Sequence, residues 1–181
     1  MVERPDEEII EECLRGNLGA FEELVQKYEK VMYNTALRMV RDPEDAADIT
    51  QNAFLKVFER LGRYDRQHKF FSWLYRIVVN ESLNFLKARK VTIPHDETIP
   101  STTLQPDAKF HQTETTQVVE EALLDLPVEQ RIVLILRHFH NLSYREISNV
   151  VEVSEKKVKS RLFAGRQGLR KLLTQRGLFQ I

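Results

Sequence analysis

The chain has 181 residues, a formal net charge of zero and one cysteine. This length allows one large domain or two small ones, and the low content of proline and glycine predicts an all-α protein. Because Cys13 is alone, an internal disulfide and a cysteine metal cluster are excluded, which favours a reducing, cytoplasmic setting. The sequence has no apolar run of about 18 residues and no basic-then-apolar leader, so we expect neither membrane insertion nor export.

The first half of the chain is expected to form four helices. The spacing of its apolar residues places them at about 6–15, 18–40, 43–61 and 72–88. The third has a well-defined start, because Asp42-Pro43-Glu44 combines a capping side chain, a proline at the first helical position and acid in the first turn. These helices are predicted to make up a first domain, residues 1–91.

The third helix separates its residues onto two faces. The stripe expected to be buried contains Ala46, Ile49, Ala53, Phe54, Val57, Phe58 and Leu61. The outward face carries Asp45, Asp48, Gln51 and Asn52. Acidic residues near a helix N-terminus also interact favourably with the helix dipole, so a purely structural role is one interpretation. The other is an acidic, amide-rich face that binds a basic protein partner.

Aromatic and basic residues are interleaved between Arg60 and Arg76, where Asp65 is the single acid. Some of these aromatic residues are expected in the core. However, single-stranded bases also stack on aromatic rings among positive charges, at about 1 to 3 kcal/mol per base. On the fourth helix one surface stripe contains Trp73, Arg76, Asn80, Asn84 and Lys87. Asparagine is a poor helix former, so two asparagines one turn apart favour a contact role.

Residues 92–116 differ in composition from both flanks. They contain three prolines, many threonines and few apolar residues, which predicts a flexible linker. A second domain, residues 117–181, is expected to follow. Its helices should begin with one at 118–126 and a second that Pro127 opens and that ends near His140.

The end of the chain has the pattern of a helix-turn-helix. Ser143 and Glu146 form a capping-box pattern for one helix, and Ser154 can cap the next. The second helix has an apolar stripe and an exposed face without acid after Glu155. A helix-turn-helix places such a helix in the major groove, where basic side chains meet phosphates. A solvated basic helix, favoured by the helix dipole, is the alternative.

Four segments, taken in order, resemble the extracytoplasmic-function sigma factors of bacterial RNA polymerase. They are residues 45–54, 71–80, 124–131 and the helix-turn-helix at 142–162. The resemblance covers nearly the whole chain apart from the linker. It implies a transcription initiation factor that performs no covalent chemistry, with no catalytic residues, no cofactor and no metal. Its implied partners are core RNA polymerase, through the β′ clamp and the β subunit, and promoter DNA, with an anti-sigma factor as the partner that regulates many family members.

The resemblance also implies roles for individual residues. Polymerase binding would involve Asp45, Asp48, Gln51 and Asn52. Recognition of the melted -10 element would involve Tyr64, Arg66, Lys69, Phe70, Trp73, Arg76, Asn80 and Asn84, with loop 64–70 capturing a flipped base. Recognition of the -35 duplex would involve Lys156, Lys157, Lys159, Ser160, Arg161, Phe163 and Arg166. Of these, Lys159, Ser160 and Phe163 would contact base edges, whereas Lys157, Arg161 and Arg166 would hold phosphates.

Three positions depart from the family's pattern. Asn52 stands where glutamate is common, Glu152 where glycine is usual in the turn, and Ala164 where some members have a base-contacting arginine. At Glu152 the turn either avoids a positive φ or accepts strain. His138 and His140 would point to different sides of a helix, so we expect them to be incidental.

Two other classes of protein remain open on the sequence. A two-domain helix-turn-helix regulator, with a sensory or dimerising N-terminal half, would bind duplex DNA without polymerase. An anti-sigma-like helical module is disfavoured by the basic second helix. For a sigma factor, a flexible linker would allow a closed arrangement, and we expect the free protein to hide its DNA-binding faces.

Overall fold

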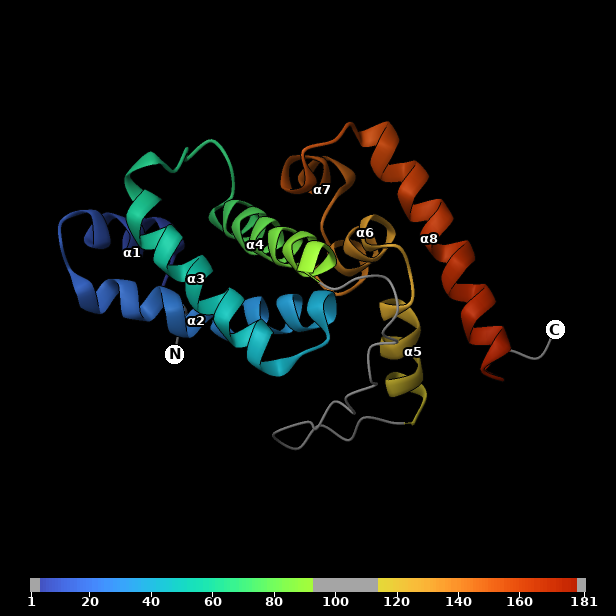
Figure 1. Ribbon diagram of the computed structural model, residues 1–181. Coiled ribbons are helices and arrows are strands. Elements are labelled where there is room, and N and C mark those ends of the chain that lie inside the picture. The colour runs from blue at the N-terminus through green and yellow to red at the C-terminus, as the bar shows by residue number, and fades with distance from the viewer. Residues whose placement is uncertain (1–3, 93–113, 179–181) are drawn as a thin grey trace.

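The computed structural model describes residues 4–92 and 114–178, and within these ranges every regular element is a helix. The elements are α1 (Asp6–Leu14), α2 (Leu18–Val40), α3 (Pro43–Arg60), the short 3₁₀ helix η1 (Leu61–Arg63), α4 (Phe70–Thr92), α5 (Glu114–Leu124), α6 (Val128–His138), α7 (Tyr144–Val151) and α8 (Glu155–Gln175) (Figure 1). The all-α prediction is confirmed. None of the described helices is both long enough and apolar enough to cross a membrane.

The predicted helix ranges agree closely with the structure in most places. The second helix has the expected bounds, whereas α4 begins at Phe70 and continues to Thr92, beyond the predicted 72–88. The helix α5 begins at Glu114, inside the range predicted as linker. Most of that range, residues 93–113, lies outside the described residues.

Local capping explains where several helices begin. Oδ1 of Asp42 accepts hydrogen bonds from the backbone N–H groups of Glu44 and Asp45, at 2.9 and 3.0 Å. At α7, Oγ of Ser143 accepts from the backbone of Glu146 at 3.2 Å while the Glu146 carboxylate accepts from the backbone of Ser143 at 2.8 Å. Each bond satisfies a donor that the helix leaves free. The predicted cap and capping box are therefore confirmed.

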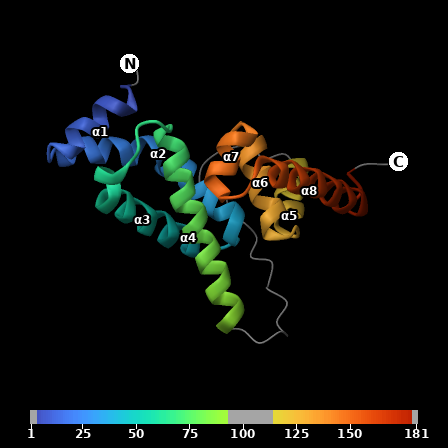
Figure 2. The ribbon, with the colours of Figure 1, turned by 90° about the horizontal axis from the view of Figure 1, so that it is seen from above.

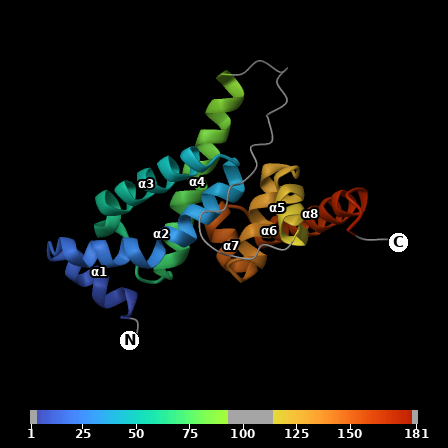
Figure 3. The same cartoon turned by 90° about the horizontal axis from the view of Figure 1, so that it is seen from below.

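The first half packs α1 to α4 around a shared apolar core, with α3 lying across α2 and α4 (Figures 1 and 3). Six of the seven residues predicted for the buried stripe of α3 are buried. The prediction was wrong for Phe58, whose side chain is 52% exposed. Its ring meets Phe21 edge-on at a centroid distance of 5.0 Å, which covers one side and leaves the other open.

The second half surrounds α6, which is the most deeply buried of its helices. The long helix α8 approaches α6 closely at a glycine. A Cβ atom at Gly165 would lie 3.0 Å from Cδ1 of Leu134. Glycine therefore permits the close contact that orients α8, with Val158 and Leu162 facing inward and the opposite face outward.

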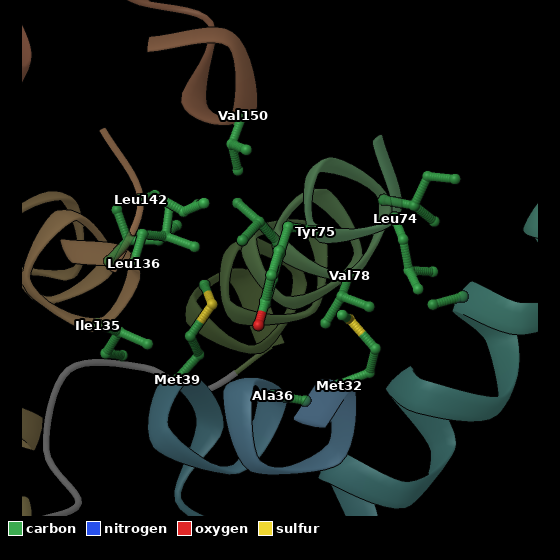
Figure 4. Packing of buried hydrophobic residues seen from close by; sticks show 14 of the residues in the cluster. Met32, Ala36, Met39, Leu74, Tyr75, Val78, Ile135, Leu136, Leu142 and Val150 are labelled. Atoms are coloured by element: carbon green, nitrogen blue, oxygen red, sulfur yellow. The ribbon is translucent and has the colours of Figure 1, made fainter. Parts of the chain in front are cut away.

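The two halves share one core across their junction. Tyr75 of α4 is 1% exposed and lies among Met39 of α2, Leu136 of α6 and Val150 of α7 (Figure 4). In the view from above, α6 and α7 lie against α2 and α4, while α8 is on the side of the molecule away from α1 to α4 (Figure 2). The sequence predicted two linked domains but not this shared core.

Candidate functional site

The outward face of α3 is largely free, as predicted. Asp48, Gln51 and Asn52 are exposed, whereas Asp45 is partly covered. A carboxylate oxygen of Asp45 lies 3.3 Å from a guanidinium nitrogen of Arg89 on α4. Burial raises the pKa of Asp45, nearby carboxylates add to this effect, and Arg89 opposes it. The acidic face therefore consists of one partly screened carboxylate and three free polar side chains.

An apolar groove of about 770 Å³ continues this face between α2 and α3. Its walls include Phe21, Val25, Gln51, Leu55 and Phe58. Leu55 is 57% exposed, although it was assigned to neither face from the sequence. The sequence spacing could have placed both apolar residues on this face. Leu55 and Phe58 follow Gln51 by four and seven residues, so they share its side of the helix.

The loop before α4 contains the predicted base-capturing residues, and the structure corrects the prediction for Phe70. This ring is 3% exposed and packs on Tyr28 of α2 and on Trp73, at centroid distances of 5.7 and 5.8 Å. Phe70 therefore supports the loop from below, and almost none of its ring is open to a base in this structure. Tyr64 is half-buried against it, with the phenol O–H donating to the backbone oxygen of His68. Arg66 is exposed and pairs with Glu11 at 2.9 Å.

The predicted stripe on α4 lies at the surface. Arg76 and Asn84 are exposed, and Trp73 and Asn80 are half-buried. An open cavity of about 620 Å³ lies between this part of α4 and α7. It is lined by Lys69, Ser72, Trp73 and Arg76 from the first half and by Arg145, Glu146, Asn149 and Glu152 among others from the second.

Two ion pairs connect Lys69, in the loop before α4, and Arg76, on the stripe, to the two ends of α7. Nζ of Lys69 lies 2.9 Å from Oε1 of Glu146, and Nε of Arg76 lies 3.4 Å from Oε1 of Glu152. Burial of Glu146 opposes its ionisation, but hydrogen bonds from Lys69 and Ser143 outweigh that effect and lower the pKa of its carboxyl to about 2. Glu146 is therefore ionised at neutral pH.

The exposed face of α8 carries six of the seven predicted DNA-contacting residues. Lys156, Lys157, Lys159, Ser160, Phe163 and Arg166 are exposed, and Phe163 is 68% exposed. The seventh, Arg161, is partly buried, and its contact with a phosphate stays a prediction. Its side chain is 19% exposed and turns toward α6, with 4.0 Å between its guanidinium and Oε1 of Glu129. Arg161 is one turn from the buried Val158, so it lies at the edge of the buried stripe.

The turn between α7 and α8 has the backbone conformation usual for glycine. Glu152 has φ 53° and ψ 44°, which is the left-handed helical region. A residue with a side chain adopts this conformation at some cost, and the turn accepts it here. Chemically, these surfaces offer basic, aromatic and amide groups for binding. Among the described residues, no cluster of three or more histidine, cysteine or acidic side chains could hold a metal ion.

Comparison with known proteins accounts for both halves. The family model for sigma-70 region 2 matches residues 24–92, and the model for sigma-70 region 4 matches residues 116–169. The RNA polymerase sigma-H factor of Pseudomonas aeruginosa is 30% identical over 96% of this chain and 96% of its own length. The ECF RNA polymerase sigma factor SigM of Mycobacterium tuberculosis is 32% identical over 94% of this chain and 86% of its own.

The chain belongs to the ECF sigma factors. It is an alternative sigma factor that directs transcription initiation, and such factors bind core RNA polymerase and promoter DNA. This membership decides between the classes that the sequence left open: the chain is a sigma factor, and neither the two-domain regulator nor the anti-sigma-like module describes it.

Solved structures agree with the fold of this sigma factor. The structure of CnrH in complex with the cytosolic domain of CnrY matches with a TM-score of 0.71 and 22% identity, covering 94% of this chain and 97% of that one. The sigma factor RpoE of Bartonella quintana, in complex with the anti-sigma factor NepR, matches with a TM-score of 0.68 and 20% identity, covering 85% and 96%. At these identities the likeness concerns the fold alone.

His140 has a structural role in this sigma factor that the sequence did not indicate. Its Nε2 lies 3.0 Å from Oγ1 of Thr35, and its Nδ1 lies 2.6 Å from the phenol oxygen of Tyr75. Because the Thr35 hydroxyl donates to the backbone oxygen of Val31, it accepts from Nε2–H. Burial lowers the pKa of His140, so the ring is neutral at neutral pH and Nδ1 accepts from the Tyr75 hydroxyl. The ring connects the two halves, so the expectation that His140 is incidental was wrong.

The neutral state of His140 should make stability depend on pH. Burial, with the nearby charge of Arg38, lowers the pKa of His140 to about 4 from 6.5. Between these values the unfolded chain binds more protons, so stability is full above pH 6.5 and falls as the pH approaches 4. Lowering the pH from about 7.5 to about 5.5 should cost roughly 1 kcal/mol of unfolding free energy through this residue.

Urea unfolding at the two pH values measures this loss. His140→Gln keeps a neutral donor and acceptor and should remove the part of the pH dependence that comes from this residue. The exposed His68 provides the matched control, and His68→Gln should retain the wild-type pH dependence. Equal pH dependence in the wild type and His140→Gln would contradict the assignment.

Proposed function

We propose that this sigma factor divides its work among three surfaces, with residues 1–91 acting as the region 2 domain and residues 117–181 as the region 4 domain. The outward face of α3 and the adjoining apolar groove bind core polymerase. The α4 stripe with loop 64–69 binds the melted -10 element, and the outer face of α8 binds the -35 duplex. The segment between the domains acts as the linker.

The observation that carries this proposal is that the α3 face, the α4 stripe and the outer face of α8 carry different kinds of side chains. The α3 face combines free polar side chains with exposed Leu55 and Phe58, as expected of a protein-binding surface. The α4 stripe presents Trp73 for stacking and Asn80 and Asn84 for hydrogen bonds to unpaired bases. Extracting those bases from the duplex costs a few kcal/mol, which these contacts must offset.

The outer face of α8 has the properties of a duplex-binding helix. Its lysines and Arg166 are exposed for phosphates, and Phe163 projects where it can contact a thymine methyl group. Promoter recognition and opening need binding and no covalent chemistry, so we assign no enzymatic activity to this chain and no cofactor. Its place of action is the cytoplasm, where polymerase and promoter meet. An anti-sigma factor for this chain stays a prediction from the resemblance.

Run-off transcription tests the assignment of the -10 surface. Core RNA polymerase, a library of promoter fragments and the full chain should give promoter-specific transcripts that require the chain. Asn80→Ala with Asn84→Ala should lower their yield by about thirtyfold, because the two amide contacts to bases are each worth roughly 1 kcal/mol. The control is Asn34→Ala, an asparagine of α2 outside the stripe. Unchanged yield in the double variant would remove α4 from -10 recognition, and absence of stimulation would argue against the function itself.

A further inference from the structure

The two ion pairs at the ends of α7 involve basic side chains to which the proposed function assigns a role in DNA binding. Lys69 and Arg76 belong to the proposed -10 surface, and their partners Glu146 and Glu152 lie at the two ends of α7 in the helix-turn-helix. Each carboxylate pairs with a cation that could otherwise bind a DNA phosphate. A strand entering the cavity between α4 and α7 must therefore displace both carboxylates.

Glu152 contributes less to its own domain than a glycine would. Its φ of 53° is strained for a residue with a side chain and relaxed for glycine. Among the described residues, the ion pair that its carboxylate makes is with Arg76, across the junction between the halves. The glutamate is thus placed in a backbone position that disfavours it, where its charge reaches the other domain.

The closed arrangement pairs two cations of the -10 surface with carboxylates and leaves the -35 surface open. The DNA-facing residues of α8 are exposed, and α8 lies away from α1 to α4 (Figures 1 and 2). The expectation that the free protein hides both faces was therefore wrong for the -35 surface. The carboxylates of Glu146 and Glu152 cover only Lys69 and Arg76 of the -10 surface.

We propose that Glu152 is an autoinhibitory side chain. Together with Glu146 it takes the place of DNA phosphates on Arg76 and Lys69. The closed sigma factor therefore binds duplex DNA through α8, but α7 must separate from α4 before single-stranded DNA occupies the α4 stripe. This inference rests on the proposed -10 surface. Both members of the Glu152–Arg76 pair are well exposed, at 62% and 48% of their side chains. Such pairs are weak, so phosphates can displace the carboxylate during promoter opening.

The test compares the binding of two probes by the full-length free chain: a short fluorescent single-stranded DNA of randomised sequence and a randomised duplex. Glu152→Gln removes the charge and keeps the backbone. We expect it to raise single-strand affinity by about threefold, the size of one exposed ion pair, beyond any change in duplex affinity. Glu121→Gln is the matched control, because Glu121 is 66% exposed and pairs with an arginine at 3.5 Å within its own domain.

Glu152→Gly provides a second variant that relieves the backbone. It should bind single-stranded DNA at least as tightly as Glu152→Gln, and its thermal midpoint should not fall below that of the wild type. If Glu152→Gln raises single-strand binding no more than Glu121→Gln does, or raises duplex binding equally, the autoinhibitory role is wrong.

Arg76→Gln separates this inference from the proposed function. The variant should weaken single-strand binding, and Glu152→Gln should have no further effect when Arg76 is already replaced. If Arg76→Gln leaves single-strand affinity unchanged, the -10 surface itself is misplaced. If Arg76 matters and Glu152 does not, the proposed function stands and the autoinhibition is refuted.

Discussion

Replacing Arg131 with methionine should lower the free energy of unfolding by roughly 3 kcal/mol. The guanidinium donates at 2.6 Å to the backbone oxygen of Met39, at the C-terminus of α2, and to that of Leu124, at the end of α5. A third bond reaches the backbone oxygen of Leu126 at 3.1 Å. Methionine fills much of the same volume but leaves three carbonyl groups without these donors.

The charge of Arg131 is held in an unusual environment. Burial, reinforced by the charge of Arg41 and opposed by Asp125, lowers the pKa of its guanidinium to about 10. Its bonds are to carbonyl oxygens, and its Nε is buried without a hydrogen-bond partner. The structure thus uses a desolvated cation to join the ends of helices from both halves, and removal should loosen the junction as well as the second half.

Urea unfolding followed by circular dichroism measures both effects. Arg131→Met should shift the midpoint to lower urea and broaden or split the transition, because the halves lose a shared contact and unfold less cooperatively. Arg145→Met is the matched control, since Arg145 is exposed on α7 and its replacement should change stability by no more than about 0.5 kcal/mol. A stabilised Arg131→Met protein would mean that desolvation of the guanidinium outweighs its three hydrogen bonds.

Features encoded by neighbouring residues were predictable. The bounds of α2 and the caps at Asp42, Ser143 and Ser154 depend on side chains within one helical turn, so the sequence is sufficient to place them. The outward face of α8 follows similarly from its apolar stripe. These local patterns, and the order of four motifs, were enough to indicate the family.

Features set by distant partners were not predictable from local pattern. Phe70 lies among basic and aromatic residues, which is also the composition of a base-stacking loop, and Tyr28 from α2 decides its burial. His140 gains its role from Thr35 and Tyr75 in the other half of the chain. Arg161 turns toward Glu129 on α6. In each case a tertiary contact decides between two roles that the same residue type can play.

Replacing Leu55 and Phe58 together by glutamine should weaken binding of core polymerase by about thirtyfold, close to 2 kcal/mol. These side chains are 57% and 52% exposed and line the groove beside Gln51. If the groove is covered by polymerase, each loses its remaining contact with water, and burial of apolar area of this size stabilises a complex by roughly 1 kcal/mol per side chain.

Because Leu55 and Phe58 are exposed, a loss of polymerase binding in the double variant can be told apart from a loss of folding. Each gives up limited contact area in the free protein, and the main loss is the edge-on contact of Phe58 with Phe21, worth roughly 0.5 to 1.5 kcal/mol. Folding should therefore persist, and binding of a -35 duplex through α8 should be unchanged. That second measurement distinguishes a damaged protein from a damaged interface.

Competition for core polymerase against a labelled wild-type chain measures the affinity. Leu18→Gln is the matched control, because Leu18 is a leucine of the same half, 69% exposed, at the first position of α2 and outside the groove. The control should compete as well as the wild type. If Leu55→Gln with Phe58→Gln also competes equally, polymerase binds the polar face of α3 without covering the groove. The exposed apolar residues would then serve a different partner, because a patch of this kind on a stable helix is otherwise a liability for solubility.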